Sequence, residues 1–367
     1  MPKLNTPLQL CPVFKEKIWG RRDLEPLYPD HWTTFRGQDI SIRYPHREGA
    51  GLTGEVWLTG DESTFKNGPL AGMTLAQACR KQRKDLCGDA IADGRFPILA
   101  KFLFTSQWLS VQVHPADDYA RKHESGSRGK CEMWYIIQAD PDAEMMVGLK
   151  PGVTSRLLGE AIDEGNCAPL LQRFTPHAGE AVFVPPGTVH ALGPGLVLFE
   201  AEENSDVTYR LDDFGRLGKD GKPRAIHREK ALAVSKPGLP ALRNLPRYTV
   251  REPYGRRRLV NACSYFAVEE LSLQRTANFK RNAARVDALA VISGEGRVET
   301  SDGWYAYRSG DIWLIPPAAH AYRLVPESKS SLLKFYVPDI EDDFIKPLTK
   351  GGWKRDEAER VVFRDPI

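Results

Sequence analysis

The sequence of 367 residues contains no long apolar run, no paired cysteine motif and no dense run of basic residues. A membrane-spanning helix needs about 20 consecutive apolar residues, and no stretch of this sequence approaches that length. The segment Met1–Leu8 lacks the apolar core of a signal peptide. We therefore expect a cytoplasmic protein that has no membrane partner.

The six cysteines are scattered and form no CxxC pair. This pattern favours reduced thiols over a disulfide framework or a structural zinc knuckle. The net charge is only +3, and the 51 basic residues are spread along the chain. Nothing in this balance indicates binding to nucleic acid, whereas a small anionic substrate is compatible with it. A chain of this length, with 41% hydrophobic residues, is long enough to form two or three folded modules.

Helical patterns occur in three places. Thr74 is suited to cap a helix that ends at Cys87-Gly88, because the apolar residues between them have helical spacing. A second helical stretch is predicted over about 153–174, and a short helix near Arg228–Val234. The rest of the chain has the pattern of short strands separated by glycine and proline turns.

Two stretches of the chain, residues 179–191 and 310–321, echo each other. In each, a glycine and an acidic residue precede an apolar strand, two prolines end the strand and a histidine follows. Such an echo indicates two related β-barrels, and evenly spaced short strands fit double-sheet jelly rolls of the cupin type. We therefore predict a mainly β protein with two cupin-type jelly-roll β-barrels and a small helical insertion.

The predicted division follows these patterns along the chain. It consists of an N-terminal catalytic barrel of residues 1–60 and 97–215, a helical insertion of 61–96, a connecting segment of 216–260, a C-terminal barrel without metal of 261–340 and a tail of 341–367.

Four polar side chains in apolar, strand-like surroundings are candidates to share one metal ion. Gln112 and His114 are two residues apart in an expected strand, which places both on one face. Glu132 and His190 follow in similar surroundings. Two imidazoles, a carboxylate and an amide oxygen suit a divalent metal and leave room for water or substrate. The second stretch of the echo lacks these ligands, so its His320 is expected to be a packed or surface residue.

Four motifs in order resemble one family of enzymes. They are Ser110–Asp118, Gly129–Tyr135, Val184–Ala191 and Glu203–Arg210. They resemble the signatures of the type I phosphomannose isomerases, as do the shorter segments Lys17–Gly20 and Gly54–Leu58. The resemblance covers about residues 10–340 and is closest to the shorter bacterial and archaeal members.

The resemblance implies an aldose–ketose isomerase that interconverts mannose 6-phosphate and fructose 6-phosphate through an enediol intermediate. It implies one zinc ion per chain, with another divalent metal as an alternative, bound by Gln112, His114, Glu132 and His190. Arg210 matches the active-site arginine of the family, and Lys130 matches a lysine of its substrate pocket. The expected partner is a small phosphosugar, and the chain is expected to be a monomer or a homodimer.

Other polar residues have more than one interpretation. Lys101 and Ser110 are candidate phosphate contacts, although inward packing is an open alternative for each. Glu200, Asp206 or a metal-bound water is eligible to carry the proton. The pair Glu202-Glu203 stands where the family is rich in amides, which places extra negative charge near an anionic substrate.

Three alternative functions stay open at this point. One is an isomerase of another phosphosugar or of free mannose, and another is a non-catalytic cupin that binds sugars. The third is an iron cupin that uses O₂, which is weaker because amide and carboxylate ligands beside cationic side chains favour anion chemistry.

Overall fold

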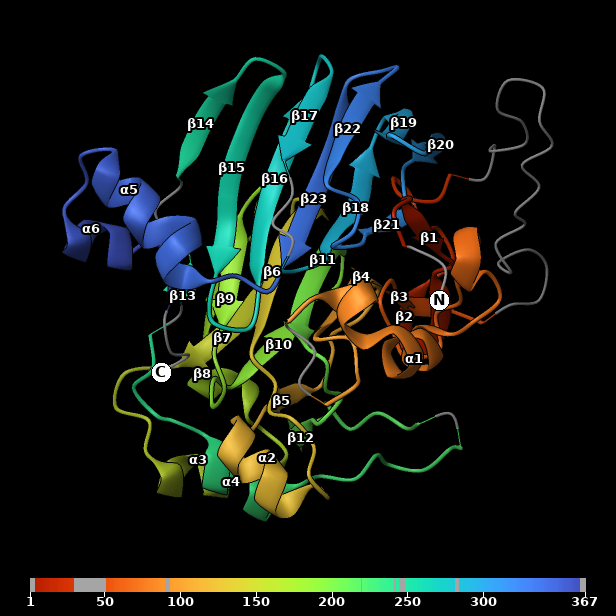
Figure 1. Ribbon diagram of the computed structural model, residues 1–367. Coiled ribbons are helices and arrows are strands. Elements are labelled where there is room, and N and C mark those ends of the chain that lie inside the picture. The colour runs from red at the N-terminus through yellow and green to blue at the C-terminus, as the bar shows by residue number, and fades with distance from the viewer. Residues whose placement is uncertain are drawn as a thin grey trace. The chain divides into compact units, whose positions relative to one another are not determined.

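The protein is mainly β in the computed structural model (Figure 1), which confirms the predicted fold class. The structure describes residues 4–29, 51–89, 93–218, 220–240, 242–243, 248–280 and 284–363. Strands predicted within residues 30–50 lie outside this range. No helix of the described residues is long and apolar enough to cross a membrane.

The chain divides into two compact units, which are described separately. Unit 1 contains Met1–Gly94, Val250–Arg257 and Glu270–Lys334, and unit 2 contains Arg95–Thr249, Arg258–Glu269 and Phe335–Ile367. One boundary lies between Gly94 and Arg95, and the others fall within β14 (Thr249–Glu252), β15 (Gly255–Ala262), β16 (Ala267–Leu273) and β23 (Ser330–Tyr336).

Unit 1 is built from short antiparallel strands. One group has the order β1-β21-β18, a second has the order β17-β22-β19-β20, and β2 pairs with β3. The further elements of unit 1 are β1 (Leu8–Leu10), β2 (Val13–Arg21), β3 (Thr53–Trp57), η1 (Gly68–Leu70), α1 (Leu75–Cys87), β17 (Ala277–Lys280), β18 (Asp287–Ser293), β19 (Glu295–Thr300), β20 (Gly303–Arg308), β21 (Ile312–Ile315) and β22 (Ala321–Pro326).

The strands of unit 1 enclose an interior that is filled with apolar side chains. Both strand groups contribute to it, and its largest members are Trp313 from β21, Tyr307 from β20 and Tyr322 from β22. His320, the histidine of the second echo stretch, is exposed, as its sequence context predicted.

Helix α1 has the bounds that its local sequence predicted. The hydroxyl of Thr74 accepts a hydrogen bond from the Gln77 amide, and the Gln77 side chain accepts one from the Thr74 amide. This reciprocal pair satisfies two backbone donors that the first turn would otherwise leave unpaired. Gly88 follows the helix with a φ of 74°, a backbone conformation that favours glycine.

Unit 2 contains two groups of antiparallel strands, with the orders β12-β5-β10-β7-β8 and β13-β9-β6-β11-β4. Their bounds are β4 (Ile98–Phe104), β5 (Val111–Val113), β6 (Glu132–Ala139), β7 (Met145–Leu149), β8 (Leu171–Phe174), β9 (Ala181–Val184), β10 (His190–Leu192), β11 (Leu196–Glu203), β12 (Tyr209–Asp212) and β13 (Leu242–Arg243). The helical elements are α2 (Asp117–His123), α3 (Ser155–Glu164), η2 (Ala168–Leu170), α4 (Arg228–Val234), η3 (Glu341–Ile345), α5 (Lys346–Lys350) and α6 (Arg355–Glu359).

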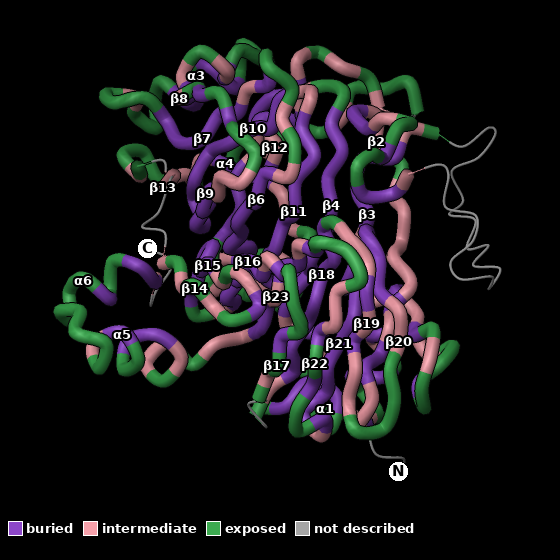
Figure 2. Tube along the Cα trace, turned by 90° about the horizontal axis from the view of Figure 1, so that it is seen from above, coloured by how far each residue is buried: buried purple, intermediate pink, exposed green. Residues whose placement is uncertain are grey.

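Two helices cover the outer face of the group β12-β5-β10-β7-β8. Val111 and Val113 of β5 pack in one apolar cluster with Leu158 of α3 and Ala231 of α4. Because side chains alternate along a strand, Gln112 between the two valines projects to the opposite face. That face meets strands β4, β6 and β11, which are almost wholly buried (Figure 2).

The helix predicted over residues 153–174 is too long. Helix α3 ends at Glu164, because Gly165 adopts the left-handed conformation (φ 62°) and its backbone N–H donates to the carbonyl oxygens of Ala161 and Ile162. After one turn of 3₁₀ helix, Leu171–Phe174 forms strand β8 and pairs with β7. Helix α4 has the predicted bounds, and the predicted connecting segment 216–260 also contains β13, β14 and most of β15.

Candidate metal centre

Strand pairing in unit 2 brings the predicted ligands to one surface. The Cα atom of Gln112 lies opposite His190 of β10 on one side and opposite Arg210 of β12 on the other. Directly opposite residues of antiparallel strands project to the same face. Gln112, His190 and Arg210 therefore form one row, and His114, two residues after Gln112, points to the same side.

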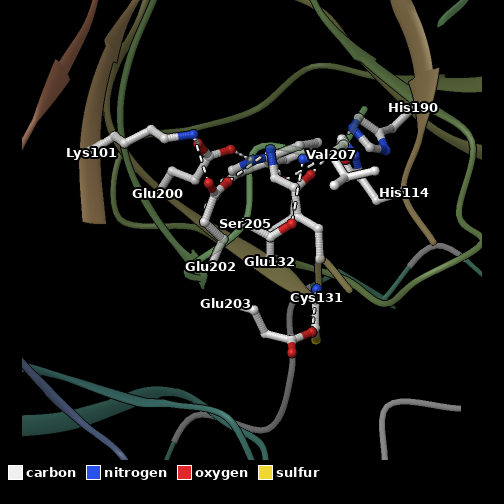
Figure 3. Close-up of polar contacts among 12 residues, drawn as sticks. Lys101, His114, Cys131, Glu132, His190, Glu200, Glu202, Glu203, Ser205 and Val207 are labelled. Atoms are coloured by element: carbon white, nitrogen blue, oxygen red, sulfur yellow. Dashed lines mark hydrogen bonds and ion pairs between the residues drawn. The ribbon is translucent and has the colours of Figure 1, made fainter. Parts of the chain in front are cut away.

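Glu132, the first residue of β6, meets the two histidines from the facing strands. Its Oε2 lies 3.5 Å from Nε2 of His114, and its Oε1 lies 3.2 Å from Nε2 of His190. All three side chains are buried, and their candidate ligand atoms lie within 4.8 Å of one another. Figure 3 shows the imidazoles beside the Glu132 carboxylate.

Backbone carbonyls determine which imidazole nitrogens are available. Nδ1 of His114 lies 2.9 Å from the Val207 carbonyl oxygen, and Nδ1 of His190 lies 2.9 Å from that of Thr188. A carbonyl oxygen only accepts, so each Nδ1 carries the proton and donates it. Each Nε2 is then left with a lone pair that faces Glu132, as in metal-binding histidines.

The charge states agree with a cation-binding role. Burial lowers the pKa of His190 to about 4, so this imidazole is neutral at neutral pH. Burial opposes the charge of Glu132, yet the nearby His114 and Lys130 hold the pKa of Glu132 well below its usual range. The centre thus combines the neutral imidazole of His190 with an ionised carboxylate, which are the states in which these groups bind metals.

A second group of charged side chains adjoins Glu132. Lys101 Nζ lies 3.2 Å from Glu200 Oε2 and 2.7 Å from Glu202 Oε1. Lys130 Nζ lies 2.9 Å from Glu202 Oε2 and 3.4 Å from Glu132 Oε2. Although burial opposes its charge, Glu202 and Glu132 raise the pKa of Lys130. We call Lys101, Lys130, Glu200 and Glu202 the lysine–carboxylate group.

Trp134 connects this group to the metal ligands. Its indole Nε1 donates a hydrogen bond of 2.9 Å to Glu200 Oε1. Its ring also packs edge-on against His190, with 5.2 Å between ring centroids. Trp134 therefore fixes the orientation of a carboxylate and an imidazole together.

The other predicted site residues lie as follows. Arg210 is half-buried, burial lowers its pKa, and its Nη1 donates to the Ala225 carbonyl oxygen at 2.9 Å. Ser110 is buried and directly precedes β5. Asp206 is exposed in the loop between β11 and β12, away from the buried carboxylates.

The sequence placed Glu202 near the substrate without giving it a role, and it did not indicate Trp134 as a site residue. A signal for Glu202 was present, because it lies two residues after Glu200 in a strand and therefore shares its face. Trp134 likewise lies two residues after Glu132 and shares its strand face. Aromatic residues are common in the strands of any β protein, however, so this spacing did not mark Trp134 as a site residue. Only the pairing of β6 with β11 relates these residues to one another.

The residues present fit a divalent metal ion. Nε2 of His114, Nε2 of His190 and both carboxylate oxygens of Glu132 are buried and have no hydrogen-bond partner of normal geometry among the described residues. Leaving buried polar atoms unpaired is costly unless another partner satisfies them. Mixed nitrogen and oxygen donors of this kind suit zinc and similar ions.

Comparisons with known proteins give consistent matches. A model of the catalytic domain of type I phosphomannose isomerase matches residues 8–142. The chain is 36% identical over 326 residues to mannose-6-phosphate isomerase ManA of Bacillus subtilis (strain 168), covering 87% of this chain and 95% of that protein. It is 32% identical over 314 residues to mannose-6-phosphate isomerase of Streptococcus mutans, covering 84% and 92%.

Solved structures show the same similarity. The crystal structure of mannose 6-phosphate isomerase from Bacillus subtilis matches with a TM-score of 0.79 and 28% identity, over 90% of this chain and 100% of that chain. A zinc-bound structure of a mannose 6-phosphate isomerase matches with a TM-score of 0.67, over 90% of this chain and 99% of that chain. At 16% identity, this second match concerns the fold alone.

Proposed function

The chain belongs to the type I phosphomannose isomerase family, and we propose that it is a zinc-dependent isomerase that interconverts mannose 6-phosphate and fructose 6-phosphate through an enediol. The observation that carries this proposal is the convergence of Nε2 of His114, Nε2 of His190 and the Glu132 carboxylate, all buried and without a hydrogen bond of normal geometry to the described residues. We propose Gln112, on the same strand face as His114, as the fourth ligand. The proposed ion is zinc, with another divalent metal as the alternative.

The reaction moves one proton between neighbouring carbon atoms and a second between the oxygens that they bear, and it neither adds nor removes atoms. A base takes the proton from the carbon beside the carbonyl, and the proton returns to the former carbonyl carbon. Negative charge develops on the substrate oxygens in between, and the barrier falls only if that charge is stabilised. A bound divalent ion supplies Lewis-acid stabilisation worth several kcal/mol.

Glu200 is the better placed of the two carboxylates proposed to carry the proton. Its oxygens lie in the buried carboxylate cluster with those of Glu132 and Glu202, whereas Asp206 is exposed. Lys101 and Trp134 hold the Glu200 carboxylate from two sides, which fixes the direction of its lone pairs. We therefore assign proton transfer to Glu200.

Cationic side chains supply the remaining electrostatic stabilisation. Lys130 is a buried ammonium beside Glu132, and we assign it to the substrate oxygens. Arg210 shares a row with Gln112 and His190, and we assign it to stabilising the enediolate or guiding the proton. Lys101 is held by two carboxylates, which favours a positioning role over the predicted phosphate contact.

The test is metal analysis together with an isomerase assay on mannose 6-phosphate. The purified protein should contain about one equivalent of divalent metal, and chelation should abolish turnover. His190→Ala should lose both the metal and the activity, whereas His320→Ala, which changes the exposed histidine of the other echo stretch, should keep both. Retention of metal and rate by His190→Ala would contradict this ligand set.

The same assay separates the alternative functions. Equal turnover of unphosphorylated mannose would reject specificity for the phosphate. Tight sugar binding without turnover, unaffected by Arg210→Ala, would support a non-catalytic binding protein instead.

A further inference from the structure

Glu202 stands between the two buried lysines beside the candidate metal centre. Its side chain is fully buried, and its two oxygens face different ammonium groups, Lys101 at 2.7 Å and Lys130 at 2.9 Å. Figure 3 shows Glu202 between Lys101 and the Glu132 carboxylate. Its oxygens lie within 4.8 Å of those of Glu132 and Glu200, but Glu202 is not among the proposed metal ligands.

The backbone fixes this position of Glu202. On the paired strands β11 and β6, the Cα atom of Glu202 lies directly opposite that of Glu132. Two residues earlier, Glu200 lies opposite Lys101 of β4 and Trp134 of β6. Side chains two apart on a strand share a face, so Glu202 projects into the same interior as the candidate ligand Glu132.

Lys130 is within reach of two carboxylates and lies closer to one of them. Its ammonium is 2.9 Å from Glu202 Oε2 and 3.4 Å from Glu132 Oε2. A buried ammonium needs a carboxylate partner, because an unpaired buried charge is strongly unfavourable. Burial raises the pKa of Glu202, and the adjacent Lys101 and Lys130 oppose that rise; its contacts of 2.7 and 2.9 Å with the two ammonium groups are those of ion pairs. Without a carboxylate at this position, the Glu132 carboxylate would be the remaining partner of Lys130 in this contact set, and a close ion pair there would occupy the lone pairs that a metal requires.

We propose that Glu202 is a positioning residue that holds the ammonium of Lys130 away from Glu132 and so keeps the Glu132 carboxylate available to the metal ion. This inference rests on the proposed metal-dependent function. Glu202 is not one of the proposed metal ligands, and in this proposal it acts through Lys130.

The experiment measures the zinc affinity of the metal-free protein by competition with a chromophoric chelator. Glu202→Gln should bind zinc on the order of tenfold more weakly than the wild type, the size of effect seen for residues that orient metal ligands. The matched control is Glu203→Gln, which changes the next buried glutamate. Glu203 faces away and accepts a hydrogen bond from the Cys131 amide, so this variant should keep the wild-type affinity.

A double variant separates this mechanism from a simple loss of negative charge. In Lys130→Met/Glu202→Gln no ammonium is left to occupy Glu132, so zinc affinity should return to within about threefold of the Lys130→Met value. If Glu202 acted only by attracting the cation through space, the tenfold loss would persist in the Lys130→Met background. Such persistence would overturn the proposal, as would an unchanged affinity of Glu202→Gln.

Two further readouts keep the test decisive. If Glu202→Gln fails to fold, Lys130→Met alone still tests the idea, because removing the competitor should leave zinc affinity unchanged or raise it, and a loss would contradict the proposal. A wild-type protein that binds no zinc would reject the proposed function itself. A wild type that binds zinc and turns over mannose 6-phosphate, with no effect of Glu202→Gln, would reject only this inference.

Discussion

The carboxyl group of Asp311 in unit 1 is buried in the second stretch of the sequence echo. It accepts hydrogen bonds from the Arg308 amide and from Gln9 Nε2, both at 3.0 Å. These contacts do not offset its desolvation, and burial raises the pKa of Asp311 from 3.8 to about 6. The folded protein therefore binds a proton here that the unfolded chain has lost, over about pH 4–6.

Stability should consequently fall as the pH rises through this window. The loss from Asp311 amounts to about 3 kcal/mol and is complete about one pH unit above the folded-state pKa. Asp311→Asn cannot ionise, and the Gln9 amide can rotate to accept from the new side chain. Denaturant unfolding from pH 4 to 8 should show a flatter profile for this variant and a higher free energy of unfolding at pH 8. Asp302→Asn, at an exposed acid, serves as the control, and an Asp311→Asn protein less stable than the wild type at pH 8 would contradict the argument.

At the scale of elements, the start of helix α1 depends on the reciprocal hydrogen bonds between Thr74 and Gln77. Thr74→Ala removes the side-chain acceptor and should lower the free energy of unfolding by about 1 kcal/mol. Thr74→Ser keeps the hydroxyl and should stay near the wild type in the same denaturant titration. Equal losses in both variants would mean that packing of the threonine methyl, rather than the cap, stabilises the helix.

Helices with strong local signals could be predicted from the sequence, and β8 could not. Thr74 and Gly88 define α1 through interactions within one turn of the chain, so the sequence alone contains the information. The residues Leu171–Phe174 continue the apolar pattern of the preceding helical stretch, and their strand conformation depends on pairing with β7. Pairing partners about 25 residues apart leave no local trace in a short strand.

The candidate site shows the same limit at the scale of the molecule. His114, Glu132 and His190 could be proposed as ligands because polar residues stood out in apolar strands. The contact of Glu202 with Lys101 and Lys130 could not, because it depends on the register of three strands. A sequence pattern indicates which side chains are unusual, whereas the pairing of strands determines which of them meet.

The thiols give a prediction for the whole molecule. All six cysteines are free, and only Cys11 is not buried. Burial also raises the pKa of some of these thiols, that of Cys167 to about 12, which disfavours the reactive thiolate. A thiol reagent at neutral pH should therefore modify one cysteine of the native protein rapidly and all six after denaturation. Fast modification of a second thiol without denaturant would reveal local opening.

The filled interior of unit 1 has a practical consequence for protein engineering. Installing histidine and glutamate there, in imitation of unit 2, would bury them against Trp313, Tyr307 and Tyr322 rather than around an ion. These aromatic side chains would first have to be replaced by smaller ones, and truncating one such buried residue typically lowers the free energy of unfolding by about 3–5 kcal/mol. The echo between the two stretches thus reflects a shared strand-and-turn pattern and does not by itself provide a catalytic site. When ligand residues are transferred from one unit to the other, the volume available for them should be considered before their chemistry.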